Sequence, residues 1–159
     1  MHAWFFIDVD NRTKTDDEYS SGYGNNIYLK GILMEQTIEV KVYYEDTDCL
    51  GIVYHANYLK YMERGRTEYF NSSGKTVQQL NEEGYYFAVY EIKIKFLKPA
   101  KLGDVCRVIS SIGKEGSEYR KKMIQRIESN GLLLVEAEVD IICLNKEKQL
   151  IVFPKGLLD

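Results

Sequence analysis

The fold of this chain is constrained most by a single long helical pattern that is followed by segments alternating apolar and polar residues. Such alternation appears before the helix at residues 38–44. It returns after the helix at residues 90–97, 104–112, 119–128, 132–144 and 150–153. Short turns separate the later segments, and Asn130-Gly131 is a strong signal for a tight hairpin. The pattern predicts an α+β fold, with one long helix lying across a mainly antiparallel sheet.

Residues 57–71 carry the helical pattern. Tyr58, Met62 and Tyr69 form an apolar stripe, and the opposite side is expected to hold Glu63, Arg64, Arg66 and Glu68. Gly74 suits the end of this helix. Thr76 followed by Gln79 matches a capping box, which predicts a short second helix ending near Gly84.

The segment before the long helix reads as a half-buried strand. One face of it is expected to carry Ile38, Val40, Val42 and Tyr44. Residues 1–33 differ, because residues 8–26 are polar and show no sustained period. We therefore predict an N-terminal extension over 1–33, disordered or non-native, and one domain over 34–159, with Met34 as the hypothetical natural start.

Composition excludes several classes of protein. The net charge of −3 argues against a nucleic-acid partner, which usually requires a basic excess. Three cysteines without a CxxC pair suggest neither a disulfide framework nor a zinc site, in keeping with a reducing cytoplasm. The chain has no apolar run of about 18 residues, so no membrane span is expected, and its start is a poor signal peptide.

The chemistry concentrates between the first strand and the long helix. Asp46 and Asp48 follow the strand, Gly51 suits a sharp turn, and the helix begins near His55–Asn57. Helix N-termini present unpaired N–H groups that can hold an anion or polarise a carbonyl. Asp48 is ionised at neutral pH, since an ordinary Asp titrates near 3.9. These residues predict a carboxylate nucleophile or general base beside an oxyanion site.

The same residues carry a resemblance to a known family. Residues 43–58 read Tyr-Tyr-Glu-Asp-Thr-Asp-x-x-Gly-x-Val-Tyr-His-Ala-Asn-Tyr, and residues 61–68 read Tyr-Met-Glu-Arg-Gly-Arg-Thr-Glu. This motif closely resembles the 4-hydroxybenzoyl-CoA thioesterase superfamily, and within it the YbgC family of Tol-Pal-associated acyl-CoA thioesterases. The resemblance covers about residues 36–155.

The resemblance implies a hotdog fold and hydrolysis of acyl-CoA to free acid and CoA, without a cofactor or a metal. The family's catalytic acid falls on Asp48, and the N–H that holds the thioester carbonyl falls on His55. The resemblance also implies active-site roles for Tyr44 and for the His55 side chain. Substrate contacts are expected at Gly51, Val53 and Tyr54. Family enzymes assemble as dimers, often paired into tetramers, with active sites between subunits.

Each assignment has an alternative. Asp48 could merely cap the following turn, and Asp46 is expected to hold that turn. His55 could pack at the helix start, and Tyr44 could lie in the core. Cys49, beside Asp48, could be read as a nucleophile, but no third group is evident to orient it.

Coenzyme A carries phosphates, so basic residues should lie near the pocket mouth. Arg120 and Lys121, followed by Lys122, occupy a strand start where related enzymes place phosphate-contacting residues, although three basic residues on a strand can also be a solvated face. Lys93, Lys95 and Lys101 are further candidates.

Two motif interpretations fail. An EF-hand loop starting at Asp46 would place Leu50 and Asn57 where calcium ligands are needed. An aspartyl phosphatase would need a parallel sheet and a longer chain.

Two functions other than hydrolysis remain: a non-catalytic acyl-binding module and a hotdog dehydratase. The sequence leaves open the acyl chain, the carrier (CoA or acyl carrier protein), the exact role of Asp48, dimer or tetramer, and any Tol-Pal link.

Overall fold

A computed structural model of the chain describes residues 35–158. The predicted extension over 1–33 and the hypothetical start at Met34 lie outside these residues. The elements follow in the order β1 (Gln36–Lys41), the 3-10 helix η1 (Tyr44–Asp46), α1 (His55–Asn71), α2 (Val77–Glu82), β2 (Tyr86–Phe96), β3 (Val105–Gly116), β4 (Arg120–Ser129), β5 (Leu132–Leu144) and β6 (Leu150–Ile151). The predicted order of strand, long helix, short helix and further strands is confirmed.

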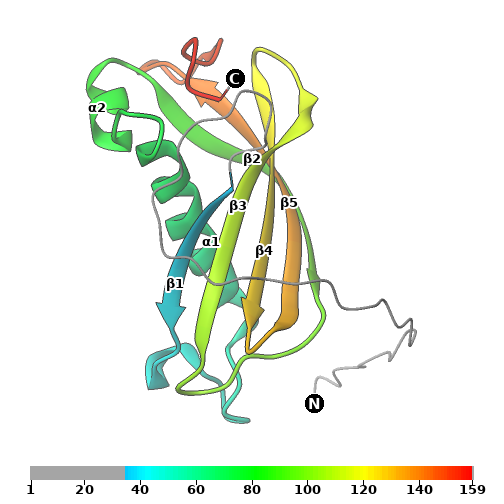
Figure 1. Cartoon of the computed structure of the whole chain (residues 1–159). Helices are drawn as coiled ribbons and strands as arrows, with labels where there is room; N and C mark the ends of the chain where they lie inside the picture. Colours follow the sequence, from blue (N-terminus) through cyan, green and yellow to red (C-terminus); the bar gives the residue numbers. More distant parts are fainter. Residues whose placement is uncertain (1–34, 159) are drawn as a thin grey trace. The chain divides into compact units, whose positions relative to one another are not determined.

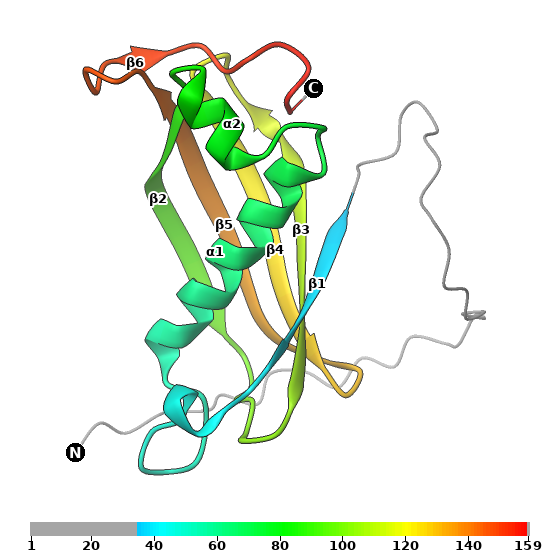
Figure 2. The ribbon, with the colours of Figure 1, turned by 90° about the vertical axis from the view of Figure 1, so that its left-hand side faces the viewer.

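The strands form one antiparallel sheet in the order β1-β3-β4-β5-β2, and β6 pairs with β5. Figure 1 shows this curved sheet, and Figure 2 shows α1 running across one face of it. The Asn130-Gly131 hairpin joins β4 to β5 with positive φ angles of 52° and 74°, as a primed two-residue turn requires. The α+β arrangement expected for a hotdog fold is confirmed.

The first strand ends earlier than its alternating pattern predicts. Val40 and Val42 are buried as expected, but β1 stops at Lys41 and Tyr44 begins η1 with 82% of its surface exposed. The extended chain is interrupted because the Asp46 N–H donates to the Tyr43 carbonyl, while the Asp46 carboxylate accepts from the Tyr43 N–H. The alternative that Tyr44 packs in the core is therefore wrong for this protomer.

Helix boundaries follow their local signals closely. α1 begins at His55, two residues before the predicted start, and ends at Asn71. The capping box of α2 is formed, since Gln79 N–H donates to Thr76 Oγ1 at 3.2 Å and Thr76 N–H donates to Gln79 Oε1 at 2.9 Å.

A glycine allows α1 to approach the sheet closely. A Cβ atom at Gly65 would lie 2.8 Å from Val108 Cγ1 and 2.9 Å from Ser110 Oγ, which is closer than side chains tolerate. Both neighbours belong to β3, so the middle of α1 is held against the centre of the sheet. The next residue on the helix, Arg66, is also buried between α1 and the sheet.

The helix–sheet contact also contains a buried polar network that corrects the sequence prediction for Arg66. Arg66 was expected on the solvent side of the helix, but it is only 5% exposed. Its guanidinium donates to Gln125 Oε1 at 3.0 Å and pairs with the carboxylate of Glu63. The charge is tolerated because both partners satisfy it. Gln125 Nε2 in turn donates to the Met62 carbonyl and to Ser110 Oγ.

Buried phenols and thiols make the fold sensitive to alkali. Burial raises the pKa of Tyr58 to about 12 and the pKa values of Cys106 and Cys143 to about 11. Their ordinary values are 10.0 and 9.0. The unfolded chain therefore loses these protons first, so the free energy of unfolding is fully retained below about pH 9 and falls as pH rises through 11 and 12.

We expect the melting temperature to decrease steadily between about pH 9 and 11, because the ionised groups are accommodated only in the unfolded state. Thermal scans by circular dichroism measure it. A melting temperature that stays level over this range would contradict the burial of these groups.

Candidate active site

The loop between η1 and α1 is a short hairpin that carries Asp48. Thr47 and Val53 pair across its base. Above this pair, Asp48 N–H donates to the Ile52 carbonyl at 2.9 Å, and Gly51 N–H donates to the Asp48 carbonyl at 3.0 Å. Gly51 has a φ of 72°, which a residue with a side chain adopts only at a cost in free energy. Glycine at this position therefore permits the turn that the sequence predicted.

The Asp48 carboxylate is half-buried and one of its oxygens takes part in the turn. Asp48 Oδ1 accepts a hydrogen bond from the Leu50 N–H at 2.8 Å. The capping role considered as an alternative is thus real. It does not exclude chemistry, because an ionised carboxylate has about four acceptor positions and this bond uses one. The remaining positions can accept a proton from water or approach an acyl carbon.

The hairpin leads directly into the N-terminus of α1. Tyr54 is the N-cap residue and makes no side-chain capping hydrogen bond. Its carbonyl accepts from the Asn57 N–H at 2.8 Å. The main-chain N–H groups of the first turn form the positive end of the helix dipole, and the side chain of the N-cap residue does not cap them. Such an end can stabilise negative charge on an oxygen.

Two further contacts tie the hairpin to the helix start. The Asp46 carbonyl accepts from the Tyr54 N–H at 2.9 Å and from Asn57 Nδ2 at 2.9 Å. Asn57 is 7% exposed. Sequence reasoning missed the role of the Asn57 side chain, although a polar residue among the apolar positions of the helix stripe was a usable signal. These bonds fix the position of the Asp48 loop relative to the N-terminus of α1.

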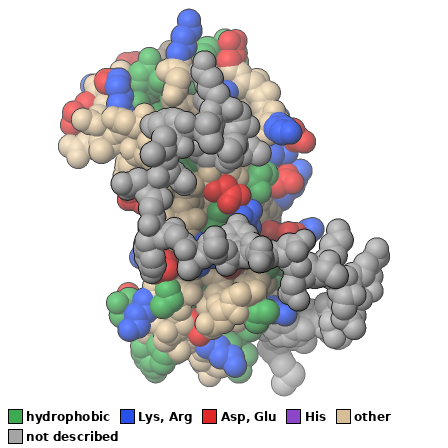
Figure 3. All heavy atoms as spheres, in the orientation of Figure 1, with side chains coloured by type: hydrophobic (Ala, Val, Ile, Leu, Met, Phe, Trp, Pro, Cys, Tyr) green, Lys and Arg blue, Asp and Glu red, His purple; other side chains and the backbone are tan. Residues whose placement is uncertain are grey.

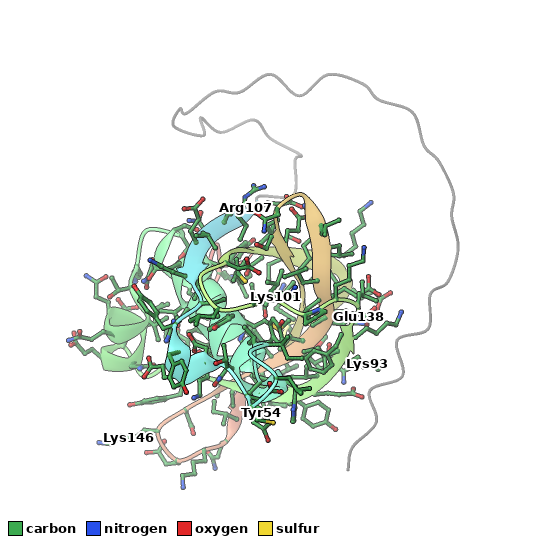
Figure 4. The ribbon with its side chains drawn as sticks, turned by 90° about the horizontal axis from the view of Figure 1, so that it is seen from below. Tyr54, Lys93, Lys101, Arg107, Glu138 and Lys146 are labelled. Atoms are coloured by element: carbon green, nitrogen blue, oxygen red, sulfur yellow. The ribbon has the colours of Figure 1, made fainter. Side chains whose placement is uncertain are left out.

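Aromatic side chains surround the start of α1. The His55 ring lies against Tyr54 at 4.4 Å between centroids and against Phe96 at 6.3 Å. Tyr54, Phe96 and Leu50 are each more than one third exposed. Figure 4 views the molecule from this end, with Tyr54 labelled. Val53, by contrast, belongs to the buried core, and its N–H donates to the Ala100 carbonyl.

The predicted phosphate-binding pair lies elsewhere in the protomer. Arg120 is the first residue of β4. Ile127, on the same strand, pairs with Val135 of β5, and Val135 pairs with Phe96 of β2. Seven residues at about 3.4 Å each separate Arg120 from Ile127 by roughly 24 Å. Adjacent strand residues also face opposite sides of the sheet, so Arg120 and Lys121 do not share a face. Arg120 lies 3.6 Å from Asp140 and over the Tyr90 ring.

A different lysine lies beside the loop. Lys101 pairs with Ile52 through the main chain, which places it next to the turn that carries Asp48. Lys93 and Lys95, the other candidates, lie on β2 opposite Glu138 and Glu136. Figure 3 shows acidic and basic side chains interspersed over the uncovered part of the visible face, without a large area of one sign.

Within residues 35–158, no three His, Cys, Asp or Glu side chains gather closely enough to hold a metal ion. The helices of this part of the chain include none that is long and apolar enough to cross a membrane.

Comparison with known proteins finds consistent relatives. The family model described as thioesterase superfamily matches residues 50–118. The chain is 40% identical over 121 residues to "Acyl-CoA thioesterase YbgC" of Haemophilus influenzae, covering 73% of this chain and 86% of the relative.

Solved structures agree with these sequence relatives. A probable thioesterase from Bartonella henselae superposes with a TM-score of 0.72 at 31% identity, covering 76% of this chain and all of the other. A 4-hydroxybenzoyl CoA thioesterase gives the same TM-score at 19% identity, covering 79% of this chain and 99% of the other, which supports the fold alone.

Proposed function

This chain belongs to the YbgC-type acyl-CoA thioesterases of the thioesterase superfamily, and we propose that Asp48 is the carboxylate with which it hydrolyses acyl-CoA. The observation that carries the proposal is the hairpin of residues 47–53. It holds a half-buried carboxylate in the loop that runs directly into the N-terminus of α1, where the N-cap side chain makes no capping hydrogen bond. A carboxylate beside an amide-rich helix end matches the needs of thioester cleavage.

In the proposed reaction, the thioester carbonyl oxygen accepts a hydrogen bond from the His55 N–H. Negative charge that develops on this oxygen is stabilised by the dipole of α1. Asp48 then either attacks the acyl carbon, giving a mixed anhydride that water hydrolyses, or takes a proton from an attacking water. In both routes the carbon–sulfur bond breaks, CoA leaves as a thiolate that takes up a proton, and the free acid remains. Tyr44, Gly51 and Tyr54 are proposed to line the substrate path.

A thiol-release assay with a panel of acyl-CoA substrates tests this function. Release of CoA at a rate that saturates with substrate supports hydrolysis. Binding without CoA release would favour an acyl-binding module, and loss of water from a hydroxyacyl substrate would favour a dehydratase. The same panel, repeated with acyl carrier protein thioesters, identifies the preferred carrier.

We further propose that two copies of the chain pair through β2. This strand has 11 residues and ends the order of the sheet, so β5 pairs with only one of its edges. Val89, Tyr90 and Phe96 along it are each more than one third exposed. A long, partly apolar free edge is a template for pairing with another strand. Pairing about a two-fold axis is antiparallel, and it would bring the Arg120 end of one copy toward the α1 start of the other.

Val89→Glu is expected to break this pairing, because a buried, unpaired carboxylate at the interface is unfavourable. We expect the unsubstituted protein to show the mass of a dimer or tetramer by light scattering and the variant to show a monomer with lower activity. Val152→Glu is the matched control, because Val152 is similarly exposed outside β2. A monomeric unsubstituted protein with full activity would refute the pairing.

A further inference from the structure

Asp46 holds the two sides of the catalytic hairpin together. Its carboxylate Oδ2 accepts from the Tyr43 N–H at 2.9 Å, which closes η1 at the end of the first strand. Its carbonyl accepts from the Tyr54 N–H and from Asn57 Nδ2, which anchors the start of α1. Asp48 lies two residues further on. Asp46 therefore connects the segment after β1, the Asp48 loop and the N-terminus of α1.

The ring of Tyr61 packs in the core, where it contacts the Tyr58 ring, and its hydroxyl is buried with it. Tyr61 is completely buried, yet its hydroxyl has no hydrogen-bond partner of normal geometry among the described residues. It follows Asn57 by one turn, so both side chains lie on the same face of α1. Burial and the neighbouring Asp46 carboxylate raise the pKa of Tyr61, so the phenol stays protonated and can donate toward that carboxylate.

An unsatisfied buried hydroxyl destabilises a fold, and one beside a reaction site suggests a role in function. Phenylalanine would fill the same space without the polar atom. The retained hydroxyl faces a carboxylate that already carries the hydrogen bond closing η1. A second contact on the Asp46 side chain, in addition to the bond from the Tyr43 N–H, would restrict its movement further and, through the main chain, the position of Asp48.

We propose that Asp46 is a positioning residue for hydrolysis, supported from below by Tyr61, and that the pair sets the placement of Asp48 relative to the N-terminus of α1. Neither residue contacts substrate. The inference rests on the proposed catalytic role of Asp48. It goes beyond that role because it assigns the precision of the site to a second carboxylate and a buried phenol.

The first test compares two substitutions of Asp46 with a matched control. Asp46→Ala is expected to lower kcat by about 10- to 100-fold with KM changed little, since displacement of a reacting group by about 1 Å has effects of that size. Asp46→Asn keeps an oxygen that can accept from the Tyr43 N–H, so it should restore most of the activity. Asp104→Ala is the control, because Asp104 Oδ2 accepts from the Lys101 N–H at 2.8 Å in the same kind of turn.

Asp104→Ala should lower the melting temperature about as much as Asp46→Ala but leave kcat unchanged. Equal kcat values for these two alanine variants would overturn the proposal, because Asp46 would then act on the fold alone. If Asp48→Asn abolishes turnover while Asp46→Ala retains it, only this inference fails. Turnover that survives in Asp48→Asn would instead refute the catalytic assignment itself.

The second test, Tyr61→Phe, remains informative if Asp46→Ala does not fold. Removing an unpartnered hydroxyl should leave the melting temperature unchanged or raise it. We expect kcat to fall several-fold with KM unchanged. Tyr69→Phe is the control, since Tyr69 is another buried tyrosine on α1. A Tyr61→Phe variant with unaltered kcat would remove Tyr61 from the proposal, and where Asp46→Ala does not fold, that same result would overturn the proposal.

Discussion

Asp48→Asn is expected to lower kcat by about 10²- to 10⁴-fold, the contribution typical of a positioned general base, while KM for acyl-CoA changes little. The substitution is well suited to the structure. Asparagine keeps an oxygen that can accept the Leu50 N–H, so the turn that Asp48 Oδ1 now closes should persist. What is removed is the negative charge, which both proposed routes require. Thiol release under saturating substrate measures the effect.

Asp104→Asn is the control for that experiment, because it makes the same chemical change in the neighbouring loop. It should keep the kcat of the unsubstituted protein. Both variants should unfold at nearly the same temperature, which separates loss of chemistry from loss of structure. An Asp48→Asn variant with normal turnover would leave this protein with its fold but without its proposed catalytic residue.

Gln125→Leu is expected to reduce the free energy of unfolding by about 3 kcal/mol, although leucine has a similar volume. Gln125 is completely buried and makes three hydrogen bonds, to Arg66, Ser110 and the Met62 carbonyl. Leucine would leave the buried guanidinium of Arg66 with one partner fewer and would remove the donor that now reaches the Ser110 hydroxyl and the Met62 carbonyl. Urea denaturation measures the change, with the slope against urea expected to stay constant.

Gln78→Leu makes the same substitution on the exposed surface of α2, where the Gln78 side chain donates a hydrogen bond to Glu82. Its effect should stay within about 0.5 kcal/mol. Similar losses in the two variants would indicate that leucine itself is unfavourable in this protein. A neutral Gln125→Leu would show that the network under α1 contributes nothing net, as some buried charged networks do when all members are replaced.

The sequence was sufficient to predict the helices and strands and the place of the proposed site along the chain. Alternation of apolar residues identified the strands, and Asn130-Gly131 and the Thr76 capping box located a turn and a helix start. The motif from Tyr43 to Tyr58 indicated both the family and Asp48. All of these signals are local, because they depend on the backbone period and on hydrogen bonds between residues a few positions apart.

The tertiary structure decided what happens between distant segments. The sequence pattern places Arg66 on the solvent side of the helix. In the structure it is buried, and Gln125, 59 positions away, accepts its hydrogen bond in the core. Gly65 is unfavourable within an isolated helix. The structure explains it, because Val108 and Ser110 lie too close to leave room for a side chain. The sequence predicts only that Tyr61 is a helix residue. The structure shows that its hydroxyl is buried and that the Asp46 carboxylate is its charged neighbour.

Placement of the basic residues was settled in the same way. Arg120 and Lys121 follow each other in the chain, but the pleat sends them to opposite faces, and the length of β4 separates them from the start of α1. Lys101 instead lies beside the loop that carries Asp48, through its pairing with Ile52. The sequence alone determined which local conformations are favourable and where along the chain a carboxylate precedes a helix start. Only the folded chain determined which polar groups lose water and what satisfies them, because burial is set by packing between segments far apart in the chain.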